Sequence, residues 1–312
     1  MKKILVIGVT GLVGSRTVRL AEKLGHTAYG TYNARPISAP GAFKLDITDR
    51  PATLAFVQKI HPDVIIDTAA LHNVDHCETH HEEADRVNVE ATRTLADAAV
   101  ANGSRFIFLS TDFVFDGNSA PYAETDPPNP LHYYAKTKVD AEKIVSELPS
   151  YAIARPSVIY GWNPVEATGV PSSSGKTVNF AMYCIDKFGK NESVKVVNDQ
   201  YSSPTLADNL AEALLKLVQY DGDGIFHTAG RSCLTRYDFA IRIANTFGYS
   251  TDLIQPVATS DLKQLALRPL NSCLSVESTE KELGMRFLTA DEGLQVMKGQ
   301  LATEQVTVAR NA

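Results

Sequence analysis

Residues 3–14 read KILVIGVTGLVG, an apolar run that ends at a glycine and passes through two further glycines. The run 3–8 is predicted as a buried strand, and 12–24 as a helix with apolar residues at helical spacing. Glycines at 8, 11 and 14 permit a tight turn, close approach of the backbone to a pyrophosphate, and close helix–strand packing. The stretch therefore predicts the opening strand, turn and helix of a dinucleotide-binding fold.

The first half of the chain repeats this alternation of strand and helix. Such alternation predicts an α/β fold, a Rossmann-type doubly wound parallel sheet, with ligands at the carboxyl ends of the strands. Further strands are predicted at 26–32, 64–68, 105–110 and 151–155, and helices at 51–60, 82–102 and 135–148.

The second half is less regular and predicts a smaller mixed α/β substrate lobe. Residues 163–176 are rich in Pro, Gly and Ser, which indicates a loop. Strands are expected at 194–197 and 224–227, with a helix at 207–218 between them. We predict a dinucleotide-binding domain at 1–156, to which about 198–228 returns, a substrate-binding lobe at 157–197 and 229–302, and a frayed tail at 303–312.

Composition excludes several classes of protein. The chain has 312 residues, 44% hydrophobic and 21% charged, with a net charge of −6. It has no basic run for nucleic acid and no apolar stretch of the roughly 18 residues that a membrane helix needs. The four cysteines, Cys77, Cys184, Cys233 and Cys273, lack pairing or metal-ligand spacing. They predict reduced thiols in a cytoplasmic protein, and no metal site is expected.

The end of the second strand bears on which cofactor binds. Sites that prefer NAD place a carboxylate there, about 20 residues after the glycine turn, to hold the ribose 2′-hydroxyl. The stretch 30–35 contains no carboxylate and ends in Arg35. A guanidinium can bind a 2′-phosphate bidentately, which favours NADP(H). The alternative is that Arg35 is a solvated loop charge.

Other small or polar residues are expected around the same cofactor. Asp46 and Ile47 lie where many such folds cover the adenine, although Asp46 could equally cap the following helix. The predicted cofactor-binding residues are Gly8, Thr10, Gly11, Leu12, Val13, Gly14, Asn33, Arg35, Asp46, Ile47, Ala69, Ala70, Tyr134 and Lys138.

The segment 134–138 carries the candidate acid–base chemistry. On a helix, Tyr134 and Lys138 lie four apart on one face, where the ammonium is expected to lower the pKa of the phenol towards neutrality. Such a phenol can give a proton to a carbonyl oxygen. Tyr133 is the less suitable acid because Thr137 stands four residues after it. Upstream, Ser110 and Thr111 end a strand, where a hydroxyl can bond a developing alkoxide.

These motifs together resemble the extended short-chain dehydrogenase/reductase superfamily, and within it the dTDP-4-dehydrorhamnose reductase family. The resemblance implies that Thr111 orients the keto oxygen, Tyr134 is the acid, and Lys138 holds both the ribose and the tyrosine. It implies NADP(H)-dependent reduction of the 4-keto group of a nucleotide-diphosphate sugar, and by analogy a homodimer through the helices beside the sheet. The matching segments are 8–14, 69–75 with Glu78, 87–88, 110–117, 130–131, 134–138, 198–200, 204–205 and 268–272.

The substrate lobe departs from that family. The family usually has Thr-Ser-Trp where this chain has Pro156-Ser157-Val158, and an Arg where this chain has Cys273. Both changes bear on which sugar binds. Arg268 is a candidate for a diphosphate, with a plain loop charge as its alternative. The predicted substrate contacts are Ser110, Asp112, Val158, Asn179, Gln200 and Arg268.

Two other functions fit the same motifs. The regulatory β subunit of methionine adenosyltransferase belongs to the same branch, keeps much of the cofactor site and lacks the Trp, so a non-catalytic NADP-binding subunit is one alternative. An NAD-dependent nucleotide-sugar epimerase or dehydratase is the other, because those enzymes share the Tyr/Lys pair. They often carry the acidic residue that is missing near Arg35.

Overall fold

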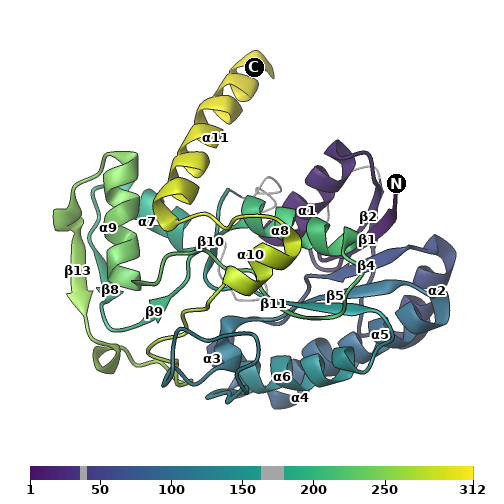
Figure 1. The fold of residues 1–312 in the computed structure, drawn as a ribbon. Helices are drawn as coiled ribbons and strands as arrows, with labels where there is room; N and C mark the ends of the chain where they lie inside the picture. Colours follow the sequence, from purple (N-terminus) through teal and green to yellow (C-terminus); the bar gives the residue numbers. More distant parts are fainter. Residues whose placement is uncertain (36–40, 163–178, 312) are drawn as a thin grey trace.

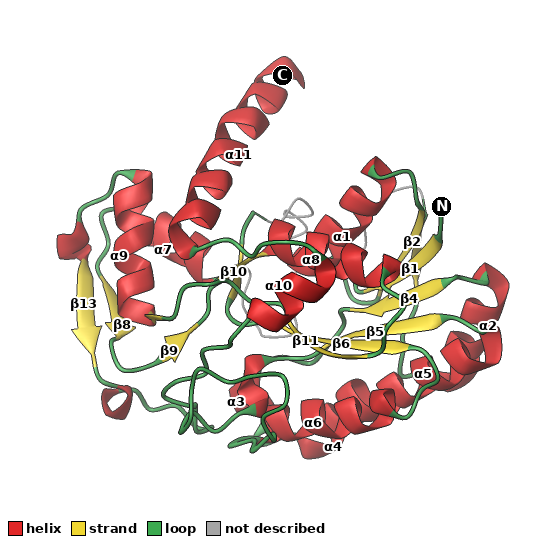
Figure 2. Cartoon of the chain, viewed as in Figure 1, coloured by secondary structure: helices red, strands yellow, loops and turns green. Residues whose placement is uncertain are grey.

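A seven-stranded parallel sheet forms the centre of the molecule (Figures 1 and 2). The computed structural model describes the backbone of residues 1–35, 41–162 and 179–311, and side chains up to residue 301. The strand order is β11-β6-β5-β4-β1-β2-β3, which confirms the predicted Rossmann-type fold. The strands are β1 (Lys3–Ile7), β2 (Thr27–Tyr32), β3 (Ala42–Lys44), β4 (Val64–Asp67), β5 (Arg105–Leu109), β6 (Tyr151–Arg155) and β11 (Gly224–His227).

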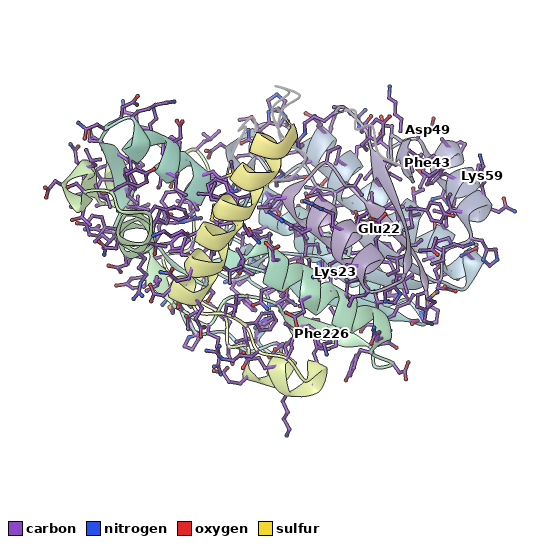
Figure 3. The ribbon with its side chains drawn as sticks, turned by 90° about the horizontal axis from the view of Figure 1, so that it is seen from above. Glu22, Lys23, Phe43, Asp49, Lys59 and Phe226 are labelled. Carbon is purple, nitrogen blue, oxygen red and sulfur yellow. A yellow bond between two sulfur atoms is a disulfide. The ribbon has the colours of Figure 1, made fainter. Side chains whose placement is uncertain are left out.

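Helices cover both faces of the sheet because successive strand residues point to opposite sides. Ile4 and Val6 of β1 pack in the layer that includes Leu210 and Leu214, whereas Leu5 and Ile7 pack in the layer that includes Leu95. Phe43 on β3 and Phe226 on β11 mark the two edges in the view from above (Figure 3). The first layer holds α1 (Leu12–Lys23) and α8 (Ala207–Gln219), and the second α2 (Arg50–Ile60), α5 (Ala91–Asn102) and α6 (Tyr133–Ser146).

The helix predicted at 82–102 is divided in the structure. It consists of α4 (His81–Asp85), a π-helical turn at Arg86–Glu90, and α5, and it is preceded by the short α3 (Val74–Cys77). The buried Asn88 lies in the π turn, accepts a hydrogen bond from the backbone N–H of Leu71 and donates to the hydroxyl of Thr137. Through Asn88, the π turn connects the helix before α5 to the segment that follows β4. The periodicity of apolar residues in the sequence does not predict such a turn.

A smaller unit follows β6, with its own apolar core around Phe239, Ile243 and Met297. Its elements lie together to one side of the sheet (Figure 1). They are β7 (Ile159–Tyr160), α7 (Phe180–Gly189), β8 (Val194–Val197), β9 (Tyr201–Ser202), β10 (Thr205–Leu206), β12 (Leu234–Thr235), α9 (Arg236–Phe247), β13 (Ile254–Val257) and α11 (Ala290–Asn311), with 3-10 turns at Thr251–Leu253 and Thr259–Asp261. The remaining helix, α10 (Glu277–Leu283), packs against α8 and against β11 of the central sheet instead.

Two expectations from the sequence are wrong. The tail predicted to fray from residue 303 is helical to Asn311, and α11 extends away from the body (Figure 1). No proline interrupts that stretch, and adding a residue to an existing helix costs far less than starting one.

The cysteines are the second correction. Cys233 and Cys273 form a disulfide with a Cα–Cα distance of 5.5 Å, although they stand 40 residues apart, while Cys77 and Cys184 are free and buried. Both cysteines lie next to residues that pair with β9. Cys233 directly precedes β12, which runs antiparallel to β9, and Cys273 lies two residues after Asn271, which forms a bridge with Tyr201 of β9. These pairings bring together two segments that are distant in the sequence.

None of the described helices combines the length and apolar character needed to cross a membrane.

Candidate active site

The glycine turn after β1 is stabilised by its own backbone. Gly8 has a φ of 89°, its carbonyl accepts from the N–H of Gly11 at 3.0 Å, and its N–H donates to Thr31 at 3.0 Å. A Cβ on Gly14 would stand 2.5 Å from the Gly8 oxygen, so only glycine lets α1 lie this close to the turn. The N-terminus of α1 has no side-chain cap and no acidic residue in its first turn. Its free N–H groups and positive dipole end suit a phosphate.

The end of β2 carries the cation expected from the sequence. Arg35 is partly buried, and this desolvation lowers the pKa of its guanidinium. Asn33 donates to the side chain of Asp46, whose Oδ1 also accepts from Thr48. The alternative role of Asp46 as a helix cap is wrong: Asp49 caps α2, at 3.0 Å from a backbone N–H.

The end of β4 lies against the glycine turn. A Cβ on Gly8 would be 3.3 Å from the backbone nitrogen of Ala69, and the hydroxyl of Thr68 donates to the carbonyl of Ile7 at 2.6 Å. The small side chains of Ala69 and Ala70 therefore follow directly after this close approach of two strands.

The candidate acid lies at the start of α6. His132 caps the helix by accepting from the N–H of Ala135 at 3.1 Å. Tyr134 and Lys138 are both buried, four residues apart on this helix. Tyr133 points elsewhere, because its hydroxyl donates to Asp85 at 2.8 Å and its ring stacks on His81. Of the two tyrosines, Tyr134 therefore stays the candidate acid.

The prediction that the ammonium of Lys138 lowers the pKa of the Tyr134 phenol is wrong. Burial raises the pKa of Tyr134, the charges of Asp112 and Cys77 raise it further, and a hydrogen bond with Thr111 acts in the opposite direction. The sequence placed Lys138 correctly in spacing but could not show that the phenol would be desolvated to this degree. A phenol with a raised pKa is fully protonated at neutral pH.

The ammonium of Lys138 is surrounded by other groups. It lies 3.8 Å from the centre of the Phe108 ring, and burial lowers the pKa of Lys138 to about 8, while the charges of Asp67 and Glu142 act in the opposite direction. Asp67 is the register partner of Phe108 on the neighbouring strand. Lys138 therefore shares one site with a carboxylate that the sequence analysis did not select.

Asp67 is itself unusual. It is 1% exposed, burial raises its pKa to about 6, and its Oδ2 has no hydrogen-bond partner among the described residues. The sequence did contain a signal for Asp67, which is a carboxylate at the end of an otherwise apolar strand. Charged residues are rarely buried without a partner, so a carboxylate at such a position points to a functional site.

The strand end at 110–112 connects three segments. Asp112 is buried, and its Oδ2 accepts from the hydroxyls of Ser157 and Ser272, each at 2.6 Å. Its Oδ1 accepts from Thr111 at 3.1 Å. Burial raises the pKa of Asp112, whereas these three hydroxyls lower it. Ser110 is also buried, and its hydroxyl has no partner in the described part of the chain.

The other predicted substrate contacts lie on the smaller lobe or its connections. Val158 directly follows Ser157 and has a φ of 40°, a rare conformation for a β-branched residue. Asn179 caps α7 and donates to the carbonyl of Gly161 at 2.7 Å, and Gln200 donates to Thr259 at 3.0 Å. Arg268, expected near a diphosphate, forms an ion pair with Asp75 at 2.6 Å, which joins the two halves of the molecule.

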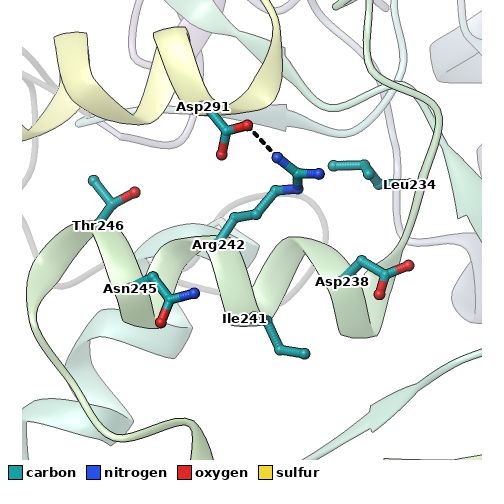
Figure 4. A pocket seen from close by; sticks show the side chains of 7 residues that line it. All are labelled: Leu234, Asp238, Ile241, Arg242, Asn245, Thr246 and Asp291. Carbon is teal, nitrogen blue, oxygen red and sulfur yellow. Dashed lines mark hydrogen bonds and ion pairs between the residues drawn. The ribbon is translucent and has the colours of Figure 1, made fainter.

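A surface hollow between α9 and the start of α11 contains none of the predicted site residues. An ion pair between Arg242 and Asp291 spans it (Figure 4). Within the described residues, no group of three or more His, Cys, Asp or Glu is placed to hold a metal ion.

Comparison with known proteins identifies the family. The family model described as RmlD substrate binding domain matches residues 1–302. The chain belongs to this family. Its membership confirms the resemblance to dTDP-4-dehydrorhamnose reductases and the extended short-chain dehydrogenase/reductase superfamily.

Relatives of this RmlD-family chain cover almost all of it. It is 33% identical over 94% of its length, and 96% of the relative's, to a probable low-salt glycan biosynthesis reductase of Haloferax volcanii. It is 31% identical over 89% of its length to the methionine adenosyltransferase 2 subunit beta of Danio rerio, of which it covers 84%. The solved structure of a dTDP-4-dehydrorhamnose reductase from Bacillus anthracis in complex with NADP has a TM-score of 0.83, with 26% identity, covering 96% of this chain and all of that one.

Proposed function

We propose that this protein catalyses the NADP(H)-dependent reduction of the 4-keto group of a nucleotide-diphosphate sugar. The observation that carries the proposal is the burial of the Tyr134 phenol beside the end of β5, where Thr111 lowers the pKa of this phenol and burial raises it. Lys138 lies one helical turn further along α6. Thr111 follows β5 at the edge of the sheet where ligands of this fold bind.

The described residues fit NADP(H). The uncapped N-terminus of α1 would hold the pyrophosphate, and Arg35 would hold the 2′-phosphate. No carboxylate stands in the stretch 30–35 to repel that phosphate. The dTDP-4-dehydrorhamnose reductase of Bacillus anthracis is solved with NADP, which supports the same cofactor here.

The bound cofactor would supply the hydride that reduces the carbonyl carbon. Thr111 orients the carbonyl oxygen by a hydrogen bond, and the hydroxyl of Tyr134 transfers its proton to that oxygen, so that the ketone becomes an alcohol. The raised pKa of Tyr134 keeps this proton in place until the oxygen acquires negative charge. The phenolate that remains regains its proton from solvent.

One alternative function has support of its own. The 31% identity to methionine adenosyltransferase 2 subunit beta favours a non-catalytic NADP-binding subunit. The two proposals differ in turnover, since a regulatory subunit would bind the cofactor without reducing a sugar.

The test compares two adjacent tyrosines. NADPH oxidation is followed with a dTDP-4-keto-6-deoxy sugar for the native chain, Tyr134→Phe and Tyr133→Phe. We expect Tyr134→Phe to lower kcat by about 100-fold to 10,000-fold because it removes the general acid. The control Tyr133→Phe should keep kcat near the native value, because that hydroxyl bonds Asp85. A native chain that binds NADPH and reduces no 4-keto sugar would support the regulatory alternative.

A further inference from the structure

The Cys233–Cys273 disulfide has one exposed half and one buried half. Cys233 is exposed to solvent, whereas Cys273 is 1% exposed. Thiol–disulfide exchange begins with the attack of a thiolate on one of the two sulfurs, and its rate depends on access to that sulfur. A thiol in solution can therefore approach this bond at Cys233 while the chain remains folded.

Cys273 lies between two residues that are bonded to β9 and to the residue after it. The N–H of Ser272 donates to the carbonyl of Tyr201 at 3.0 Å, and the N–H of Leu274 donates to the hydroxyl of Ser203 at 3.2 Å. The other half of the disulfide directly precedes β12, which pairs with β9 as well. The disulfide therefore fastens this segment to β12, and its reduction removes a covalent restraint on Ser272.

Two hydrogen-bond routes lead from this segment to the carboxylate of Asp112. The hydroxyl of Ser272 donates to its Oδ2 at 2.6 Å. The hydroxyl of Ser157 donates to the same oxygen at 2.6 Å, and it accepts from the N–H of Ser203, the residue that also binds Leu274. The neighbours of the buried cysteine therefore act on both partners of this oxygen.

Asp112 in turn holds the hydroxyl of Thr111, the residue that the proposed function assigns to the keto oxygen. The hydroxyl donates to Oδ1 of Asp112 at 3.1 Å and accepts from the N–H of Phe113 at 3.2 Å. A hydroxyl has one proton, so the carboxylate competes with a bound ketone for the proton of Thr111. A buried carboxylate that loses the donor Ser272 depends more on its remaining donors, and it would hold this proton more strongly.

We propose that the Cys233–Cys273 bond is a thiol-exchange site whose state controls the sugar site, with Ser272 and Asp112 as the positioning residues between them. The reactant is a low-molecular-weight thiol of the glutathione class. Its thiolate attacks the sulfur of Cys233, forms a mixed disulfide there and releases Cys273 as a thiolate, which takes a proton. A second thiol displaces Cys233, so that the protein gains two thiols and the small thiols leave as one disulfide. This inference rests on the proposed function for the role of Thr111.

The reduced chain is expected to turn over more slowly and to bind NADPH as before. Release of Cys273 loosens Ser272, and the proton of Thr111 stays with Asp112. The kcat for the keto sugar should therefore fall at least about fivefold, the lower end of the usual coupling between two sites. The backbone bonds that hold the glycine turn run within the turn and to β2, so the Kd for NADPH should stay near the native value.

The exchange step is measured on the folded full chain. The chain is incubated with reduced glutathione without denaturant, free thiols are blocked, and the modified cysteines are located by mass spectrometry. We expect glutathione on Cys233 and none on Cys77 or Cys184, which are free and buried. A disulfide that stays intact until the chain unfolds in urea would overturn the inference.

The coupling step is measured by NADPH oxidation with a dTDP-4-keto-6-deoxy sugar, in the oxidised chain, the reduced chain and the chain reoxidised with oxidised glutathione. Cys233→Ser lacks the bond permanently and should match the reduced native chain. Ser272→Ala keeps the bond but breaks the first route, so its kcat should be low already and should change little on reduction. Ser275→Ala is the matched control on the same segment, since that hydroxyl bonds Glu277, and it should keep the full response of the native chain.

Three results would refute the coupling. One is an equal kcat in the oxidised and reduced native chains, and another is a Ser272→Ala variant that responds to reduction as strongly as the native chain. The third is a reduced chain that also loses its affinity for NADPH, because such a chain has lost its fold rather than the position of Thr111.

Failure of this inference can be separated from failure of the proposed function. If the native chain reduces no keto sugar, the proposed function fails, and hydrogen exchange at the amides of Ser272 and Leu274 still tests the coupling. These amides should exchange faster in the reduced chain because they lose the restraint of the disulfide. Equal protection in both states would overturn the inference, whatever the chain catalyses.

Discussion

Gly14 provides a sharp test of how the cofactor turn is built. In Gly14→Ala the new Cβ would stand 2.5 Å from the Gly8 oxygen, 2.9 Å from the Gly8 carbonyl carbon and 2.9 Å from the Thr68 hydroxyl. Two of these atoms are backbone, and the Thr68 hydroxyl is held by its bond to Ile7. The helix must therefore move away from the turn. Overpacking of this kind costs about 1–3 kcal/mol, against about 1 kcal/mol gained in helix propensity.

The expected result is a free energy of unfolding lower by up to about 2 kcal/mol and NADPH binding weakened about tenfold or more, because the α1 N-terminus shifts from its place beside the phosphates. Gly299→Ala is the matched control: Gly299 is also helical, and an added Cβ meets nothing within 4 Å. That variant should gain about 0.5–1 kcal/mol. Urea unfolding and calorimetry measure both quantities. A Gly14→Ala protein as stable and as tight for NADPH as the native chain would refute the steric argument.

Two further predictions concern Lys138 and the disulfide. Turnover that depends on the charged form of Lys138 should fall above about pH 8. Asp67→Asn removes a negative charge that raises the pKa of Lys138, so the pH at which kcat falls should decrease by about one unit or more. An unchanged pH profile of kcat in this variant would show that Asp67 does not act on Lys138. Reduction of the Cys233–Cys273 bond should lower the free energy of unfolding by up to about 4 kcal/mol, given its 40-residue separation, and an unchanged urea midpoint in dithiothreitol would show that the bond contributes nothing.

Local pattern was sufficient for the parallel sheet and for the placement of the candidate acid Tyr134 on one helix with Lys138. The run 3–14 contains its own strand, turn and helix, and each of those features depends on near neighbours in the chain. Tyr134 and Lys138 share a helix, so their spacing alone places them together. Arg35 was selected in the same way, by the absence of a carboxylate in a short stretch, and its contact with the cofactor stays a prediction.

What the sequence by itself determined is thus the alternation of strands and helices in the first half of the chain, the glycine turn and the Tyr134–Lys138 spacing. The tertiary structure alone decided the environment of each charged group. Tyr134 is desolvated, Asp67 lies beside Lys138, and Arg268 pairs with Asp75. The physical reason is that pKa values and ion pairs depend on burial and on groups distant in sequence, which neither periodicity nor spacing encodes.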